Sequence, residues 1–201
     1  MLICWSAGGL IRSTRDYRLE WAYQMLAREI RVTDSTLIGN LVTSVTFYAN
    51  TTIYIIAGLL AVLGAADKLL SFTNDLAFPG TGNRELLEIK LMLVLATFVY
   101  AYFKFTWSLR QFNLLSILVG AAPLGERDQP GIESYARRLA GANNLGGDDF
   151  NRGIRAYYFG LSASGWLFSP LLLAVLAVIV LLVLYRRDYR SAALDLLRRE
   201  S

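Results

Sequence analysis

Histidine is missing from this 201-residue chain, and cysteine occurs only once, as Cys4. The chain therefore lacks the most common general base, the most common metal ligand and the simplest pH-sensitive side chain. A single cysteine also excludes a disulfide bond within the chain. Neither a zinc-binding HExxH motif nor a nucleophile–histidine pair can form, and the sequence has no GxxxxGKS/T motif for phosphate binding. These absences predict a protein that is not an enzyme and has no cofactor and no metal site.

Charged residues are absent from two long runs, one between Asp34 and Asp67 and the other between Arg155 and Arg186. A helix needs about 20 apolar residues to cross the roughly 30 Å of hydrocarbon in a bilayer, and both runs are longer. A soluble helix of this length would carry charges on its wet face, and neither run has any. The whole chain is 55% hydrophobic, above the roughly 45–50% that is usual for soluble domains. We predict an all-α, polytopic integral membrane protein with three to four transmembrane elements.

The predicted elements form a single membrane domain over residues 1–201, joined by a polar connection at 67–83. In chain order we predict a partial first span at 1–11, a basic amphipathic interfacial helix at 12–35, a span at 36–66, a long span at 84–119, a cytoplasmic loop at 120–155, a broken span or hairpin at 156–185 and a basic cytoplasmic tail at 186–201. Asp34, Ser35 and Thr36 supply the N-cap chemistry for the span at 36–66.

The last hydrophobic stretch contains Pro170, which ends or kinks a helix at the preceding residue. Its length favours one kinked helix, because thirty residues are few for two full crossings. The arginines favour a hairpin: residues 12–34, 120–155 and 186–201 carry five each, whereas 67–85 has one lysine and one arginine. Basic segments stay on the cytoplasmic side. The charge pattern therefore favours a hairpin that enters and leaves on the same side.

The region at 120–155 is the only sizeable polar segment and is predicted to be mostly loop. A short helix is favoured at 133–139. Asp148 and Asp149 could hold a divalent ion, but adjacent carboxylates are more often only solvated. Prolines and glycines break its regularity at both ends, at Pro123, Gly125, Pro130, Gly131, Gly146 and Gly147.

The predicted span at 36–66 has two distinct faces. The aliphatic face, which includes Ile38, Val42 and Val45, suits lipid. Polar and small residues in a membrane helix turn toward protein or water, because lipid cannot satisfy them. They predict a helix–helix interface, with a water-lined conduit as the alternative. The opposite face carries Asn40, Thr43, Phe47, Asn50 and Tyr54, followed by the candidate helix-packing residues Ala57, Ala61 and Ala65.

Two lysines lie within the long span, at Lys90 and Lys104. They are fourteen residues apart, or about 21 Å along a helix. If both ammonium groups extend outward, the apolar slab between them fits a thin bilayer. Otherwise Lys104 lies inside the membrane, and since both uncharged runs lack acidic residues, its partner would be Asn50, Tyr54, a backbone carbonyl, water or a passing anion.

Several strings in this sequence resemble an uncharacterised family of bacterial membrane proteins, domain of unknown function 599, and are similar to a set of plant membrane proteins. The resemblance covers roughly residues 17–191 and implies a polytopic helical protein of about four spans in the bacterial inner membrane. Family members begin with a complete first transmembrane helix, whereas this chain starts within it. The family brings no established activity. The matching strings are REIRVTDSTLIGNL (28–41), YAYFKFTWSLRQFN (100–113), VGAAP (119–123), FNRGIRAYYFGL (150–161) and LYRRDYR (184–190).

The functional prediction is a subunit of a homo-oligomeric ion channel or small-solute transporter, because three or four spans are too few to enclose a conduit alone. Positive charge without an acidic partner would favour anions. The alternative is a non-transporting membrane scaffold or partner-binding protein. The expected partners are the lipid bilayer, further copies of the chain and an ion or small solute, with no nucleic acid. The candidate pore or polar-interface residues are Asn40, Thr43, Phe47, Asn50, Tyr54, Lys104, Arg110, Asn113 and Arg155.

Overall fold

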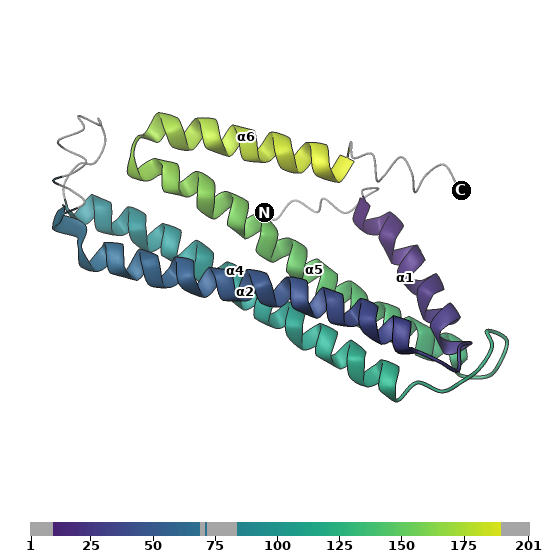
Figure 1. The fold of residues 1–201 in the computed structure, drawn as a ribbon. Helices are drawn as coiled ribbons and strands as arrows, with labels where there is room; N and C mark the ends of the chain where they lie inside the picture. The colour runs from purple at the N-terminus through teal and green to yellow at the C-terminus, as the bar shows by residue number, and fades with distance from the viewer. Residues whose placement is uncertain (1–9, 69–70, 72–83, 190–201) are drawn as a thin grey trace. The chain divides into compact units, whose positions relative to one another are not determined.

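The computed structural model describes residues 10–68, 71 and 84–189, and these residues contain helices and no strand (Figure 1). The predicted all-α class is therefore confirmed. The predictions for residues 1–9, most of the 67–83 connection and residues 190–201 lie outside the described residues. The elements are α1 (Leu10–Leu26), α2 (Val32–Gly64), α4 (Arg84–Gly120), α5 (Ile132–Ser164), a short 3₁₀ helix η1 (Gly165–Leu167) and α6 (Pro170–Tyr189).

The chain divides into two compact units, and α2, α4 and α5 each contribute to both. Of the described residues, the first unit contains α1, residues 32–44, 107–120 and 132–148. The second unit contains residues 45–64 of α2, 84–106 of α4, 149–164 of α5, η1 and most of α6.

In the first unit, a buried carboxylate ties α1 to the start of α2. Asp34 is fully buried, and its side chain accepts hydrogen bonds from Trp21 Nε1 at 2.8 Å and from Arg28 Nη1 at 3.1 Å. The predicted N-cap at 34–36 is therefore wrong, because α2 begins at Val32 and Asp34 lies inside its first turn. The carboxylate fixes the connection between two helices instead of capping one.

The predicted loop at 120–155 is also corrected in the first unit. Helix α5 begins at Ile132 and runs through Gly146 and Gly147 without a break. A Cβ on Gly146 would lie 2.8 Å from Cε1 of Phe112, and Ser108 Oγ donates a hydrogen bond to the Gly146 carbonyl at 2.7 Å. The glycine therefore permits close approach of α4 to α5. In a sequence alone, a glycine that permits close helix packing cannot be distinguished from a glycine that ends a helix.

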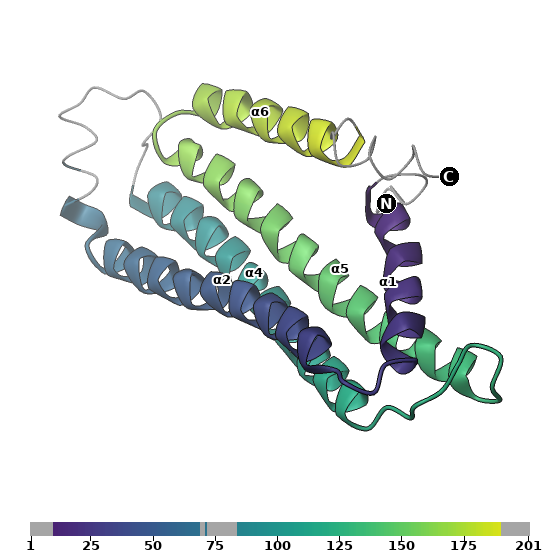
Figure 2. The ribbon, with the colours of Figure 1, turned by 45° about the vertical axis from the view of Figure 1, so that its right-hand side comes forward.

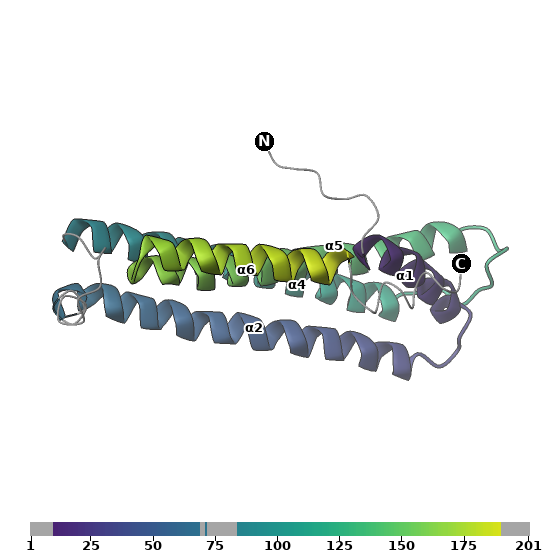
Figure 3. The same ribbon diagram turned by 90° about the horizontal axis from the view of Figure 1, so that it is seen from above.

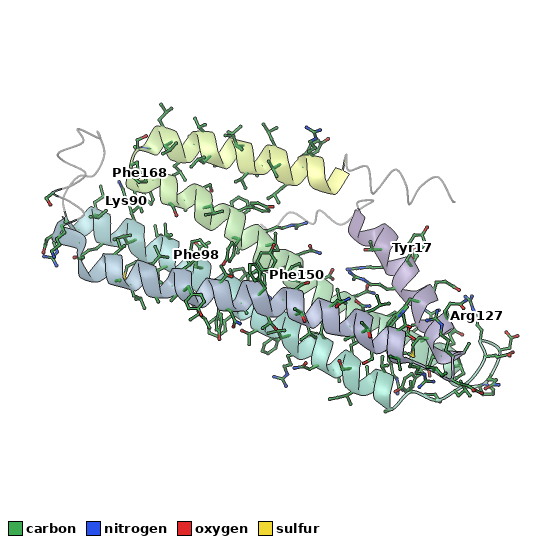
Figure 4. All side chains as sticks on the ribbon, viewed as in Figure 1. Tyr17, Lys90, Phe98, Arg127, Phe150 and Phe168 are labelled. Atoms are coloured by element: carbon green, nitrogen blue, oxygen red, sulfur yellow. The ribbon has the colours of Figure 1, made fainter. Side chains whose placement is uncertain are left out.

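The core of the second unit combines an aliphatic cluster with an aromatic one. Ala66, Leu87 and Leu91 are buried together, with Leu59, Leu63 and Leu167 packed against them. Tyr48 of α2 stacks on Phe105 of α4 with ring centroids 5.6 Å apart, and both rings contact Phe150 and Tyr157 of α5. Figure 4 shows the Phe98 and Phe150 side chains among these helices. Aromatic contacts thus hold α2, α4 and α5 together within this unit.

The break predicted at Pro170 is confirmed, and α5 and α6 form a hairpin around it. Helix α5 ends at Ser164, and Pro170 is the first residue of α6, where the missing N–H of proline costs no hydrogen bond. Ser169 caps the new helix, its Oγ accepting the Leu172 N–H at 3.0 Å. Figures 1, 2 and 3 show the turn that connects the two helices.

Two helices, α2 and α4, are long and apolar enough to cross a membrane, and a shorter apolar helix follows at Pro170–Arg186. In the most apolar 18-residue stretch of each long helix, only 17% of α2 and 33% of α4 is buried within the chain. A core helix of a soluble protein would be mostly covered by its own fold. These helices instead present apolar surface outward.

Candidate functional site

The stripe of polar and small residues on α2 is exposed in the part of the chain that the structure describes. Tyr54 is 77% exposed and Phe47 is 64% exposed. The other members, Asn40, Thr43, Asn50, Ala57, Ala61 and Ala65, are exposed as well. The alanine ladder therefore packs on no other described helix of this chain.

The opposite face of α2 is the one that packs within the chain. Ile38, Val45, Ala49 and Thr52 are buried. The prediction that Ile38 and Val45 face lipid is therefore wrong. The chain's own helices cover part of the aliphatic face, and so the polar and small face is left outside.

The threonine hydroxyls on and beside this stripe bond to their own helix, whereas the asparagine amides of the stripe do not. Thr43 and Thr51 donate to the carbonyls of Gly39 and Phe47, one turn earlier, at 2.9 and 2.8 Å. Asn40 and Asn50 make no side-chain hydrogen bond to any described residue. A primary amide carries two donor hydrogens and one acceptor oxygen. The two asparagines thus require partners from outside the chain wherever water is absent.

Lys104 has an acidic partner that the sequence analysis did not identify. Its Nζ lies 3.0 Å from Oδ1 of Asp149, and Arg152 Nη1 approaches the same oxygen at 3.5 Å. Asp149 is buried, and its neighbour Asp148 pairs with Arg15 at 2.8 Å instead. The prediction that Lys104 lacks an acidic partner is wrong, because α5 is helical through the supposed loop and carries Asp149 to α4. The two adjacent carboxylates each face a cation.

The other lysine of α4 also points inward. Lys90 is buried, and its ammonium group lies 5.5 Å from the ring centroid of Trp166 in η1. Figure 4 shows Lys90 and Phe168 near the α5–α6 turn. The outward extension considered for this lysine is therefore wrong. The indole face accommodates the cation through its negative quadrupole.

Arg110 and Asn113 share a depression on the surface of the first unit. Its volume is about 550 Å³, and its described lining consists of the α4 residues Trp107, Arg110, Gln111, Asn113, Leu114 and Ile117. Arg155, the remaining candidate, is half-buried on α5 in the second unit. The nine predicted residues thus occupy four kinds of environment: an exposed stripe of α2, an ion pair, a surface depression and, for Arg155, a half-buried position on α5.

Sequence reasoning considered Asp149 as an ion ligand and Asp34 as a helix cap, and it missed that both are buried carboxylates paired with cations. Asp149 and Arg152 have the i, i+3 spacing of helical neighbours. Many of the buried positions of α5 are three or four residues apart, a helical period that the glycines obscured. The buried residues of α5 are Ile132, Ala136, Leu139, Ala140, Ala142, Asn143, Gly146, Gly147, Asp149, Gly153, Ile154, Ala156, Gly160 and Ser162.

The fold and these features define an all-helical chain with two candidate membrane helices, an apolar helical hairpin and an internal ion pair. A family model described as protein of unknown function, DUF599, matches residues 5–193. The chain belongs to this family, which confirms the resemblance drawn from its sequence strings. Comparison with curated proteins gives no match, and comparison with solved structures gives none.

Proposed function

We propose that this chain is a multi-pass protein of the cell membrane that self-associates through the exposed face of α2 and forms a polar path for an ion or small solute. The observation that carries the proposal is the outward-facing stripe of polar and small residues on an otherwise apolar helix.

Membrane insertion is supported by the apolar surface that the fold leaves uncovered. Large aliphatic side chains on α6 are exposed, with Leu171 at 75% and Leu182 at 62%. Each such side chain placed in water instead of hydrocarbon costs about 1.5–3 kcal/mol. Residues 45–64 of α2 and 156–185 of the hairpin contain no charged side chain. Insertion into a bilayer covers this surface without placing a charge in hydrocarbon.

Self-association is supported by the unsatisfied amides of Asn40 and Asn50. Lipid offers no hydrogen-bond partner, so an asparagine amide that faced lipid would carry a desolvation penalty. The same stripe of a second copy, or water held between copies, removes that penalty. Symmetric association of several copies places their stripes around a common axis. Phe47 and Tyr54, both strongly exposed, would line the same axis.

The ion pair between Lys104 and Asp149 removes the basis for an anion preference. The expectation of anion preference assumed a positive charge without an acidic partner, whereas Asp149 is 3.0 Å away. The path proposed here is therefore lined by amides, hydroxyls and aromatic rings. Such a lining suits polar solutes through hydrogen bonding and pore width.

A flux measurement in liposomes tests the proposal through Asn50→Leu. We expect the purified chain to raise solute flux above that of empty liposomes, and Asn50→Leu to reduce the increase at least tenfold, because one polar contact in each subunit is replaced by an apolar side chain. Thr106→Val is the matched control: it removes a polar group at an exposed position of α4, where the hydroxyl bonds only its own helix at the Tyr102 carbonyl. Equal flux with and without protein would end the conduit proposal.

A scaffold function is the second candidate, favoured by the alanine ladder. Ala57, Ala61 and Ala65 are exposed at four-residue spacing, which permits close approach of another helix. Oxidative cross-linking of Ala61→Cys, in a Cys4→Ser background, separates the two functions. A disulfide-linked pair of identical chains favours self-association. Cross-linking only to a different protein favours the scaffold.

A further inference from the structure

The depression on the first unit combines three chemical features along one face of α4. Its described lining offers one cation, two primary amides and three large apolar side chains. Trp107, Arg110, Leu114 and Ile117 are spaced by three or four residues and so lie along one helical face. A ligand that fits this surface has both an anionic part and a hydrocarbon part.

The cation in this depression, Arg110, is available to an outside anion. It is exposed, and no carboxylate of the described residues lies within ion-pair distance of it. Its guanidinium group lies 5.4 Å from the ring centroid of Trp107, which restricts its position without neutralising its charge. By contrast, Arg15, Arg28, Arg84 and Arg137 each pair with a carboxylate.

The apolar side chains of the depression are largely exposed. Trp107 is 51% exposed and Ile117 is 67% exposed. A free phosphate or other small anion would leave these groups uncovered. Tryptophan and arginine together are also the side chains that anchor helices where headgroups meet acyl chains. The apolar surface therefore selects a lipid over a water-soluble anion.

We infer that this depression binds an anionic phospholipid. The guanidinium of Arg110 pairs with the lipid phosphate, with the fork geometry that suits two oxygens of one phosphate. The amides of Gln111 and Asn113 donate to the remaining headgroup oxygens. Trp107, Leu114 and Ile117 cover the first part of an acyl chain. The inference rests on the membrane insertion of the proposed function but is independent of self-association and of transport.

Fluorescence quenching by brominated lipids tests this inference with the full chain in vesicles. The vesicles contain phosphatidylcholine with phosphatidylglycerol as the minor component, and the bromines are placed near the headgroup end of one lipid or the other. The contribution of Trp107 is the difference between the unmodified chain and Trp107→Phe. We expect brominated phosphatidylglycerol to quench that contribution about fivefold more than its mole fraction predicts, as one cation near an anionic lipid implies.

Two variants identify the source of this preference. Arg110→Gln should reduce the preference to the mole fraction, whereas Arg84→Gln, which removes an arginine already paired with Asp67 and Glu88, should preserve it. Quenching in proportion to mole fraction in the unmodified chain, or a preference that survives Arg110→Gln, overturns the lipid site alone. Absence of quenching of any tryptophan by either lipid overturns membrane insertion, and the lipid site with it.

Discussion

At the residue scale, Asp149 changes the chemistry assigned to Lys104. A lysine in an apolar helix without a partner suggests a site for an incoming anion, whereas a lysine held 3.0 Å from a buried carboxylate is a structural ion pair. Arg152 approaches the same oxygen from the surface, with 60% of its side chain exposed. The Lys104 and Asp149 side chains are 23% and 9% exposed. Water therefore screens the attraction between these two charges only in part.

Removal of one partner of this pair should destabilise the fold more than removal of both. Asp149→Leu leaves the Lys104 ammonium without a partner, and we expect a loss of about 2–3 kcal/mol, somewhat below the value for a fully buried pair because Lys104 retains some solvent access. The double variant Asp149→Leu with Lys104→Met should recover most of that loss. Thermal unfolding in detergent, followed by circular dichroism, measures both.

Arg152→Gln serves as the control for this experiment. The Arg152 side chain is largely exposed, and solvent screens its 3.5 Å contact with Asp149, so we expect a change below about 0.5 kcal/mol. An equal loss for Asp149→Leu and for the double variant would show that the unpaired Lys104 charge is not the cause of the destabilisation.

At the element scale, the glycines of α5 decide how closely its neighbours approach. Gly146 lies against Phe112 in the first unit, and Gly153 lies against Phe105 in the second. A helix built from this many glycines loses intrinsic stability, since each costs about 0.5–1 kcal/mol relative to alanine. Tertiary contact offsets that loss where an aromatic ring fills the space beside the glycine.

Alanine substitution should therefore have opposite effects at different glycines of α5. Gly153→Ala places a Cβ 2.5 Å from Cε1 of Phe105, and we expect a destabilisation of about 1–3 kcal/mol from overpacking. Gly141→Ala meets no atom within 4 Å and should stabilise the helix by about 0.5–1 kcal/mol. Unfolding temperatures of the two variants, compared with the unmodified chain, give the two signs. The same sign at both positions would contradict the packing explanation.

At the scale of the whole molecule, the proposed membrane insertion makes the turn at Pro170 decisive for topology. In that proposed arrangement, the hairpin of α5 and α6 places the arginines before and after it on the same membrane face. A single kinked helix would place them on opposite faces. The hairpin therefore agrees with the tendency of basic segments to remain on the cytoplasmic side.

Accessibility of single cysteines should distinguish these two topologies. In a Cys4→Ser background, Arg138→Cys and Arg186→Cys should react with a membrane-impermeant maleimide from the same side of sealed vesicles, because the hairpin returns the chain to the face it left. Lys68→Cys, four residues after the end of α2, should react from the opposite side and acts as the control. Labelling of positions 138 and 186 from opposite sides would exclude the hairpin.

The sequence by itself determined the helical class, the two long apolar helices, the break at Pro170 and the family. These features depend on composition and on local backbone chemistry: charge-free runs, and a proline without an N–H. The sequence also showed the pattern of polar and small residues that forms the stripe on α2. It did not show that the other described helices leave this stripe uncovered.

Only the tertiary structure decided where the polar groups find partners. Asp149 and Lys104 are separated by 45 residues, and nothing local to either residue reveals the other. The glycines of α5 indicate a loop when only neighbouring residues are considered, and the rings of Phe112 and Phe105 show them to be contact points. Local sequence specifies backbone preference, whereas contacts between distant segments select among the conformations that this preference allows.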